Sequence, residues 1–539
     1  MRRPEFIAAL LATCLMAIGQ QPPEPVDISP ISGDAYYLVN QLNGMQATAS
    51  GSAAPVLDAR SFTDAGQRWT FTRGEGGWQI ANVETGLCVE ASAPAVRGRR
   101  TENMSVAVTE AACSTAAEQQ WVLRPTRNGY YTIINRATRL ALDSGAALDL
   151  TSFGRAARQS QQWLLRPAYF RGIDNALLEK QEAERVTYGL PWWNDNGRTE
   201  DVLAMFKSHG INMVRLRPSS VPPYANISQA GCSGNACYGE TEAQDLDLAR
   251  RAKNLGMSVA LTLLFDGGNS SSVPPAWSGD THLADLQSDL YSYVRSEITS
   301  YRKAGTMPDL VAIGNEVDTG FLGIIGSPTG QDFGGFAALE TSAVQAVRDA
   351  SADTSIGPAM PAPLTCIHIT PGWDLTQFFT LANQFDVPYD AICQSYYPIY
   401  HGPLTDAQAA AANPNGKPVE QDVLMKAAGQ ISKPILILET GEHYENGFQA
   451  NDPWYSPPGP GSQRQFVVDL QNVIQGLPNN LGMGIVWWDP SGVSIHNASG
   501  QLLNGDNLPD AIYIWTGLTL FDESRVSLLP AADALGGGQ

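Results

Sequence analysis

The feature that most constrains the fold is a series of eight short apolar segments that alternate with amphipathic stretches. The segments are residues 170–174, 212–217, 258–264, 310–315, 364–369, 391–396, 434–439 and 483–488. Helical spacing of apolar positions marks stretches between them, among others 200–209, 243–255, 283–304, 336–350 and 463–474. Strands that alternate with helices predict a parallel sheet, and eight βα units are the number that closes a (β/α)8 TIM barrel.

A different pattern occupies residues 34–167, where short alternating strands and turn residues occur without helical periodicity. A Gln-x-Trp motif recurs there at Gln67, Gln119 and Gln161. We expect each Trp to pack into a shared core and each Gln to hold backbone at a repeat boundary. With 539 residues, the chain is long enough for two domains. We therefore predict an all-β domain over residues 34–167 and an α/β barrel domain over residues 168–530.

The chain begins with Met1, Arg2 and Arg3, followed by an apolar stretch over residues 6–19. This is typical of a secretory signal peptide, and the stretch is too short to span a bilayer. We predict a signal peptide over residues 1–20, a proline-rich linker over 21–33, and an extracellular protein. The formal net charge of -20 disfavours nucleic acid or an anionic membrane as a partner, because phosphate groups bind to basic surfaces.

Removal of Cys14 with the signal peptide leaves six of the seven cysteines. Cys88 and Cys113 lie in one repeat, and Cys232 and Cys237 are close in sequence, so we predict two disulfides in an oxidising compartment. Cys366 and Cys393 lie on strand-like runs and are either bridged or two buried thiols.

Neither a CxxC nor an HExxH motif is present, so the sequence predicts no metal for catalysis and no other cofactor. The oxygen-rich loop over residues 489–510 is compatible with a structural calcium ion, although ordinary loop polarity explains its composition as well.

Carboxyl groups end two of the predicted strands. The fourth strand ends Gly314-Asn315-Glu316 and the seventh ends at Glu439. In a barrel of this kind, active sites lie where the strands end, so the two carboxyls should meet across the barrel mouth. Glycoside hydrolysis uses such a pair, one carboxyl as acid/base and the other as nucleophile. The arrangement resembles the large clan of retaining barrel hydrolases, and this resemblance implies Glu316 as acid/base and Glu439 as nucleophile. A separation of roughly 5–5.5 Å would indicate retention of configuration, and a wider gap would indicate inversion.

Five further motifs narrow this prediction. They are Phe170-Arg171-Gly172-Ile173-Asp174, Val214-Arg215-Leu216-Arg217, Gly314-Asn315-Glu316, Ser395-Tyr396-Tyr397-Pro398-Ile399-Tyr400-His401-Gly402 and Trp487-Trp488-Asp489-Pro490. In order and position they resemble glycoside hydrolase family 53, the endo-β-1,4-galactanases, over about residues 168–520. The resemblance implies a retaining endo-acting enzyme that cleaves β-1,4-galactan, as in pectic arabinogalactan.

The same resemblance assigns roles to residues around the pair. It implies that Asn315 binds the sugar 2-hydroxyl, that Arg215 keeps the nucleophile ionised, and that Tyr396 or Tyr397 donates a hydrogen bond to Glu439. It also implies substrate contacts by three further residues, which are Asp174, His401 and Trp488. Glu442 is a rival to Glu439, but it follows the predicted strand end.

Three segments depart from the usual pattern of the family, and they are residues 218–220, 263–268 and 440–442. We expect these loops to line the substrate groove, so the alternative substrate is another β-glycan. An alternative of another class is a carbohydrate-binding protein without catalysis, although both glutamates and Asn315 are present.

The Gln-x-Trp repeats resemble the ricin-type β-trefoil lectins, which bind sugars in shallow pockets. The resemblance places acidic sugar-binding residues at Glu90 and Asp143, whereas the first repeat has no acidic residue in 44–47. A degenerate trefoil that serves as a spacer is the alternative. Together these features predict a monomer whose partner is a polysaccharide, a β-galactan or pectic arabinogalactan.

Overall fold

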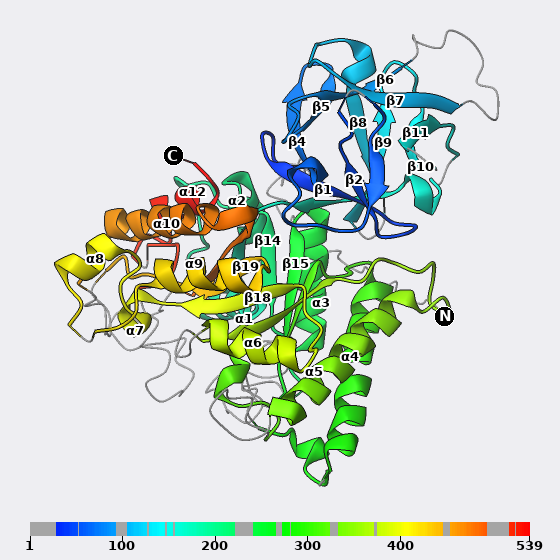
Figure 1. Ribbon diagram of the computed structural model, residues 1–539. Helices are drawn as coiled ribbons and strands as arrows, with labels where there is room; N and C mark the ends of the chain where they lie inside the picture. The colour runs from blue at the N-terminus through cyan, green and yellow to red at the C-terminus, as the bar shows by residue number, and fades with distance from the viewer. Residues whose placement is uncertain are drawn as a thin grey trace, which may run out of the picture.

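The computed structural model describes residues 29–538, with several stretches left out. The omitted stretches are 93–104, 221–240, 266–271, 324–332, 371–374, 446–452 and 493–516, together with positions 52, 127–128, 146–147, 155–156, 281, 415 and 523. A β-domain comes first in the chain and an α/β barrel follows it (Figure 1). The predicted signal peptide and most of the linker lie outside the described residues.

The first domain is built from antiparallel strands that form one continuous sheet. Its strands are β1 (Ala35–Asn40), β2 (Gln46–Thr48), β3 (Val56–Asp58), β4 (Arg68–Gly74), β5 (Gly77–Asn82), β6 (Cys88–Ala91), β7 (Ser105–Ala111), β8 (Trp121–Pro125), β9 (Tyr130–Asn135), β10 (Ala141–Ser144), β11 (Leu148–Thr151) and β12 (Trp163–Pro167). Four strands fall in each of three repeats, which confirms the predicted trefoil.

The Gln-x-Trp motif does in each repeat what the sequence predicts. Trp69, Trp121 and Trp163 are buried in one core cluster. Their indole N–H groups donate, at 2.9, 3.2 and 3.0 Å, to the carbonyl groups of Ala47, Val89 and Leu142. The glutamine amides donate to the carbonyl groups of Ala59, Ala112 and Ser152. Each Trp is therefore bonded to the second strand of its repeat, and each Gln to the residue that follows the third strand.

Eight parallel strands close the second domain into a barrel, as predicted. They are β13 (Phe170–Asp174), β14 (Met213–Leu216), β15 (Ser258–Leu263), β16 (Leu310–Ile313), β17 (Leu364–Ile369), β18 (Ala391–Tyr396), β19 (Ile435–Thr440) and β20 (Gly482–Trp488). Side chains at alternate positions fill the barrel interior, among them Phe170, Met213, Ala260, Ala312, Cys366, Cys393 and Leu436.

Helices surround the barrel (Figure 1). They are α1 (Leu178–Tyr188), α2 (Val202–Ser208), α3 (Glu242–Asn254), α4 (Leu283–Ala304), α5 (Phe333–Ala352), α6 (Leu375–Gln384), α7 (Pro398–His401), α8 (Asp406–Ala411), α9 (Glu420–Ile431), α10 (Pro460–Gln475) and α12 (Pro530–Leu535). Local sequence sets their ends. Thr241 and Gln244 form a capping box at the start of α3, and Gly305 ends α4 in the left-handed conformation.

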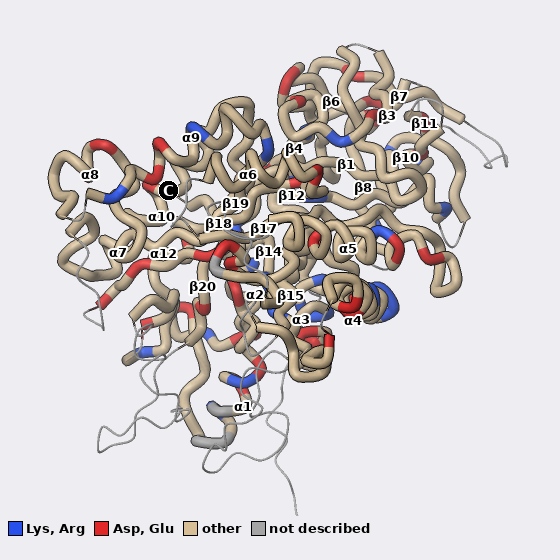
Figure 2. Tube along the Cα trace, turned by 60° about the horizontal axis from the view of Figure 1, so that its bottom comes forward, with Lys and Arg blue, Asp and Glu red and all other residues tan. Residues whose placement is uncertain are grey.

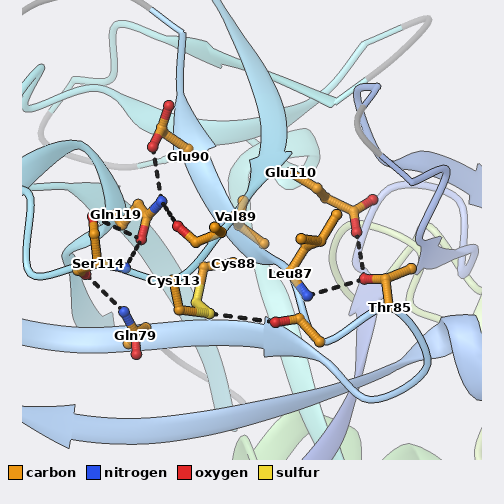
Figure 3. The surroundings of a disulfide bond; sticks show 12 residues. Gln79, Thr85, Leu87, Cys88, Val89, Glu90, Glu110, Cys113, Ser114 and Gln119 are labelled. Atoms are coloured by element: carbon orange, nitrogen blue, oxygen red, sulfur yellow. Dashed lines mark hydrogen bonds between the residues drawn. A yellow bond between two sulfur atoms is a disulfide. The ribbon is translucent and has the colours of Figure 1, made fainter.

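Two disulfides join described cysteines. Cys88 and Cys113 are bonded within the second trefoil repeat, which confirms that prediction (Figure 3). Cys366 and Cys393 are bonded between the neighbouring strands β17 and β18, so the bridged alternative holds for this pair. Cys232 and Cys237 lie outside the described residues, and their pairing stays a prediction.

The trefoil packs against the amino-terminal ends of the barrel strands. Asp34 forms an ion pair with Arg171 at the start of β13, and Arg60 forms one with Asp390, directly before β18. Tyr130 of β9 is buried in the core cluster of the barrel domain. The trefoil therefore lies at the end of the barrel opposite to the carboxyl ends of the strands.

Acidic and basic positions are interspersed along the described trace of both domains (Figure 2). Within the part of the chain that the structure describes, each helix is too short or too polar to cross a membrane.

Candidate active site

Two carboxyl side chains come together at the carboxyl ends of β16 and β19. Glu316 follows β16 after Gly314, and both residues have left-handed backbone, with φ of 49° and 83°. Glu439 is the penultimate residue of β19 and is 8% exposed. The two carboxyls are near enough for the charge of Glu439 to act on Glu316.

A β-bulge turns Glu439 toward the barrel mouth. Leu436 and Leu438 point into the barrel interior, so strict alternation would place Glu439 on the helix side. The register between β18 and β19 shifts here, because Gln394 pairs with Ile437 and Ser395 pairs with Glu439. Leu438 is therefore the extra residue, and the bulge directs the following side chain inward.

Arg215 occupies the centre of the site and has no exposed surface. Its Nη1 lies 2.8 Å from Oε2 of Glu439 and 2.9 Å from Oδ2 of Asp174. Its Nη2 donates to Oδ1 of Asn315 at 2.7 Å, and its Nε donates to Oγ1 of Thr262 at 2.9 Å. One guanidinium thus fixes the orientation of residues on four other strands or strand ends, and it supplies a positive charge beside Glu439.

Tyr397 is the tyrosine that reaches Glu439. Its hydroxyl donates to Oε1 of Glu439 at 3.1 Å. Tyr396 has no exposed surface, and its hydroxyl donates to the carbonyl oxygen of Gly402 on the helix side of β18. Side chains alternate along a strand, so the two neighbours face opposite layers, and Tyr396 is not brought to the carboxyl pair.

His401 lies behind Tyr397 and not beside Glu439. Its Nδ1 accepts a hydrogen bond from the backbone N–H of Tyr397 at 2.8 Å. Burial, with a smaller effect from the charge of Lys417, lowers the pKa of His401 to about 3. The neutral imidazole therefore holds the backbone that carries Tyr397.

The pKa of Glu316 is raised to about 7. Burial is the largest cause, and the negative charge of Glu439 adds to it. Ser395 opposes the rise, because its hydroxyl donates to Oε1 of Glu316 at 2.7 Å. Near neutral pH, Glu316 can therefore hold a proton beside a carboxylate that is paired with Arg215.

Trp488 ends β20 and is partly exposed, and the guanidinium of Arg217 lies 6.0 Å from the centre of its ring. Trp487 is fully buried and donates to the carbonyl of Leu518. Of the two tryptophans, Trp488 is the one with surface available to a ligand.

Glu442 lies beyond β19 and is 3% exposed. Its Oε1 accepts a hydrogen bond from the backbone N–H of His443 at 2.8 Å. Glu439, and not Glu442, carries the contacts with Arg215 and Tyr397 that a central carboxylate needs.

Sequence reasoning missed three inward-facing residues of the site, namely Thr262, His368 and Ser395. Each follows an interior core residue by two positions, as Thr262 follows Ala260 and Ser395 follows Cys393. Counting two residues on from the last apolar interior position of each strand would have found them, because strand side chains repeat every second residue.

The two candidate sugar-binding residues of the trefoil differ in their surroundings. Glu90 is partly exposed, and its Oε2 accepts a hydrogen bond from the amide of Gln119 at 2.8 Å (Figure 3). Asp143 is 6% exposed and is bonded to Thr151 and, at 2.9 Å, to Nη2 of Arg158.

Among the described residues, no three His, Cys, Asp or Glu side chains form a group that could hold a metal ion. Most of the predicted calcium loop is in residues 493–516, outside the described part. Asp489, at its start, accepts a hydrogen bond from Gln181 at 2.8 Å. Calcium binding there stays a prediction.

Two family models match the chain. The model for glycosyl hydrolase family 53 matches residues 170–533, which is more than half of the chain. The model described as ricin-type beta-trefoil lectin domain-like matches residues 65–163.

Similar proteins from fungi cover most of the barrel domain. The probable arabinogalactan endo-beta-1,4-galactanase A of Aspergillus fumigatus is 27% identical over 360 residues, which cover 63% of this chain and 88% of that protein. The arabinogalactan endo-beta-1,4-galactanase A of Aspergillus niger is 25% identical over 377 residues, which cover 66% of this chain and 94% of that protein.

Solved structures show the same barrel fold. The GH53 catalytic domain of Ignisphaera aggregans superimposes with a TM-score of 0.52 at 20% identity, covering 68% of this chain and 95% of that chain. A chain from a study of two fungal beta-1,4-galactanases gives a TM-score of 0.51 at 21% identity, covering 68% of this chain and 98% of that chain.

Proposed function

The chain belongs to glycosyl hydrolase family 53, and from this membership we propose that it cleaves β-1,4-galactan internally, with retention of anomeric configuration. One observation carries the proposal. A carboxyl with a pKa raised to about 7, Glu316, lies near a second carboxyl, Glu439, that is paired with Arg215 and hydrogen-bonded by Tyr397. One protonated acid and one ionised carboxylate are what a double displacement needs.

In the proposed first step, the carboxylate of Glu439 attacks the anomeric carbon while Glu316 gives its proton to the departing glycosidic oxygen. The bond between that carbon and oxygen breaks, and a glycosyl ester forms on Glu439. The ion pair with Arg215 places a cation 2.8 Å from the attacking carboxylate and holds it in position. Burial keeps the proton on Glu316 at neutral pH.

In the second step, Glu316 is ionised and takes a proton from an incoming water molecule. The water oxygen attacks the anomeric carbon, and the ester bond to Glu439 breaks. Neutralisation of Glu439 in the ester removes the charge that raises the pKa of Glu316, so the same residue becomes the base. The two carboxyls together complete the reaction, and we propose that no cofactor takes part.

The remaining site residues are assigned by their positions. Asn315, held by Arg215, is proposed to bind the sugar 2-hydroxyl, and Trp488 to form an aromatic floor under the sugar beside the scissile bond. Asp174 is 3% exposed and His401 lies behind Tyr397, so both are better placed to orient other side chains. Their direct contact with substrate stays a prediction.

The names of the fungal relatives support galactan as the substrate. The test is incubation with purified β-1,4-galactan beside xylan, mannan and β-glucan, with Glu439→Gln as the inactive control. Short galacto-oligosaccharides from galactan alone are expected. Products from a different glycan would favour the alternative substrate, and no products from any glycan would favour a binding protein.

Stereochemistry is tested separately by proton NMR of the products during the first minutes of hydrolysis. Retention predicts that the β-anomer of the new reducing end appears first and then equilibrates with the α-anomer. Early α-anomer would overturn the double displacement while leaving the substrate assignment intact.

We propose that the trefoil holds the enzyme on polysaccharide. Because it lies at the end of the barrel opposite to the carboxyl pair, it would bind a stretch of polymer other than the one being cleaved. Glu90 is accessible, whereas Asp143 is already paired with Arg158, so retention on insoluble galactan should depend on Glu90. Pull-down of Glu90→Ala and Asp143→Ala with insoluble galactan tests this, and equal retention of both variants and wild type would contradict it.

We also propose that the protein is secreted as a monomer after removal of residues 1–20. Amino-terminal sequencing of protein from a culture medium tests the cleavage, and light scattering tests the oligomeric state.

A further inference from the structure

We infer that Ser395 and His368 act as a positioning pair that fixes which oxygen of Glu316 carries the catalytic proton. This inference rests on the proposed function, because it concerns the acid/base of that reaction. Neither residue is one of the two carboxyls, and neither has a part in the two reaction steps above. Both are fully buried polar groups in the barrel interior, and Ser395 is bonded to Glu316.

The three residues form a hydrogen-bonded chain across three neighbouring strands. Ser395 of β18 places its Oγ 2.7 Å from Oε1 of Glu316, which follows β16. His368 of β17 places its Nε2 3.0 Å from the same Oγ. His368 pairs with Cys393 in the register of β17 and β18. Ser395 follows Cys393 by two positions, so the side chains of His368 and Ser395 both point inward in the same region of the barrel mouth.

The direction of each hydrogen bond follows from the number of hydrogens available. Ser395 has one hydroxyl hydrogen and donates it to the carboxyl of Glu316. Its oxygen must then accept from His368, so Nε2 of the imidazole carries a hydrogen. Nδ1 of the neutral ring consequently carries no hydrogen, and among the described residues this buried nitrogen has no hydrogen-bond partner.

The charged groups around these three hydrogen-bonded residues favour this arrangement. The carboxylates of Glu439 and Asp318 and the guanidinium of Arg215 act on Glu316, while Arg215 and Arg217 act on His368. Burial, reinforced by the two arginines, lowers the pKa of His368 well below its usual value. The ring therefore remains a neutral donor throughout the working pH range, and it holds Ser395 without exchanging a proton.

The consequence is a choice between two oxygens. Because Oε1 of Glu316 accepts the hydrogen bond from Ser395, the acidic proton of Glu316 resides on the other oxygen, Oε2. Oε2 is then the atom that faces the departing oxygen, and the bond from Ser395 stabilises the carboxylate formed when the proton leaves. Ser395 and His368 touch no sugar atom in this scheme, and they act only through Glu316.

The experiment compares two substrates that differ in their need for acid catalysis. Galactan has a poor leaving group, whereas 4-nitrophenyl β-1,4-galactobioside has a leaving group that departs without protonation. Ser395→Ala is expected to lower kcat on galactan by about 10- to 100-fold, within the usual contribution of a positioned acid, and on the aryl substrate by no more than about 3-fold. Ser351→Ala, which removes another buried serine hydroxyl bonded to the Val347 carbonyl, is the matched control.

His368 is tested by two substitutions. His368→Leu removes the donor and should reproduce the selective loss on galactan. His368→Gln places an amide nitrogen close to the position of Nε2 and should restore most of the activity. Equal losses with both substrates in Ser395→Ala, or a Gln variant as impaired as the Leu variant, would show a purely structural role and overturn the inference.

A titration separates this inference from the proposed function. Carbon-13 NMR of the side-chain carboxyl groups, assigned with Glu316→Gln, measures the pKa of Glu316 without any substrate. The pKa should rise above about 7 in Ser395→Ala, because the hydroxyl that lowers it is gone. An unchanged pKa overturns the positioning pair even if galactan is cleaved. A raised pKa supports the pair even if galactan proves to be the wrong substrate.

Discussion

Nη1 of Arg215 lies 2.8 Å from Oε2 of Glu439, and the guanidinium has no exposed surface. Two charges held this closely away from water interact strongly, and each depends on the other for compensation of its lost hydration. The ion pair therefore affects both the stability of the barrel mouth and the reaction that takes place there. A substitution at Arg215 should change both properties, and the size of each change can be measured independently.

Arg215→Lys is the substitution that tests this relationship. Lysine keeps the charge but cannot reach Glu439, Asn315 and Thr262 at once, because its ammonium is one point and not a planar fork. We expect kcat/KM on galactan to fall by about 10²- to 10³-fold, which is typical for loss of an oriented electrostatic contact. Kinetics together with thermal unfolding checks this. Activity within a few-fold of wild type would contradict the central role of the guanidinium.

The dependence of activity on pH should follow Glu316. The proposed reaction needs this residue protonated, and its pKa is raised to about 7. The rate on galactan is therefore expected to fall as pH rises through about 7. A pH profile of kcat/KM measures this limb, and a profile that stays flat to pH 9 would exclude Glu316 as the acid.

Glu316 should also affect stability with a definite sign. Its pKa is higher in the folded protein than the usual 4.5, so the fold favours the protonated form. The stabilisation is fully present below about pH 4.5 and is lost as pH rises through about 7. Glu316→Gln removes this loss, and at pH 8 it should raise the free energy of unfolding by about 1–3 kcal/mol. Denaturation at pH 4 and pH 8 checks the difference, which should be small at pH 4.

Tyr396 and Tyr397 form a natural matched pair. Tyr397→Phe removes the hydrogen bond to Glu439 and should lower kcat by about 10- to 100-fold, since the nucleophile loses a charge-assisted contact. Tyr396→Phe removes the bond to Gly402, away from the carboxyl pair, and should cost about 1 kcal/mol of stability with little effect on kcat. Steady-state kinetics and thermal unfolding of both variants decide between them, and similar kcat values would contradict the assignment of Tyr397.

The sequence predicted the barrel because eight buried parallel strands are nearly continuous apolar runs, and it placed Glu316 at a strand end because Gly314, Asn315 and Glu316 close the fourth of these runs. It could not distinguish Tyr396 from Tyr397. Glu439 faces inward only because of the bulge at Leu438, and a bulge depends on pairing between β18 and β19 that no local pattern reveals. Contacts such as Arg215 with Thr262 likewise depend on which strands become neighbours.

The junction of the two domains leads to the last prediction, which concerns another pair of neighbouring tyrosines on β9. Tyr130 is 3% exposed and belongs to the core of the barrel domain, whereas Tyr131 belongs to the core of the trefoil. Either substitution by alanine removes a buried aromatic ring and should cost about 3–5 kcal/mol. The cores meet at Tyr130, so wild type should unfold in one calorimetric transition.

Tyr130→Ala is expected to separate that transition into two, because the contact that joins the cores is lost. Tyr131→Ala should weaken the trefoil while the ring of Tyr130 still joins it to the barrel, so the single transition should move to lower temperature without separating. Differential scanning calorimetry of wild type and both variants measures this. Two transitions in the wild-type protein would show that the domains unfold independently and that burial of Tyr130 does not couple them.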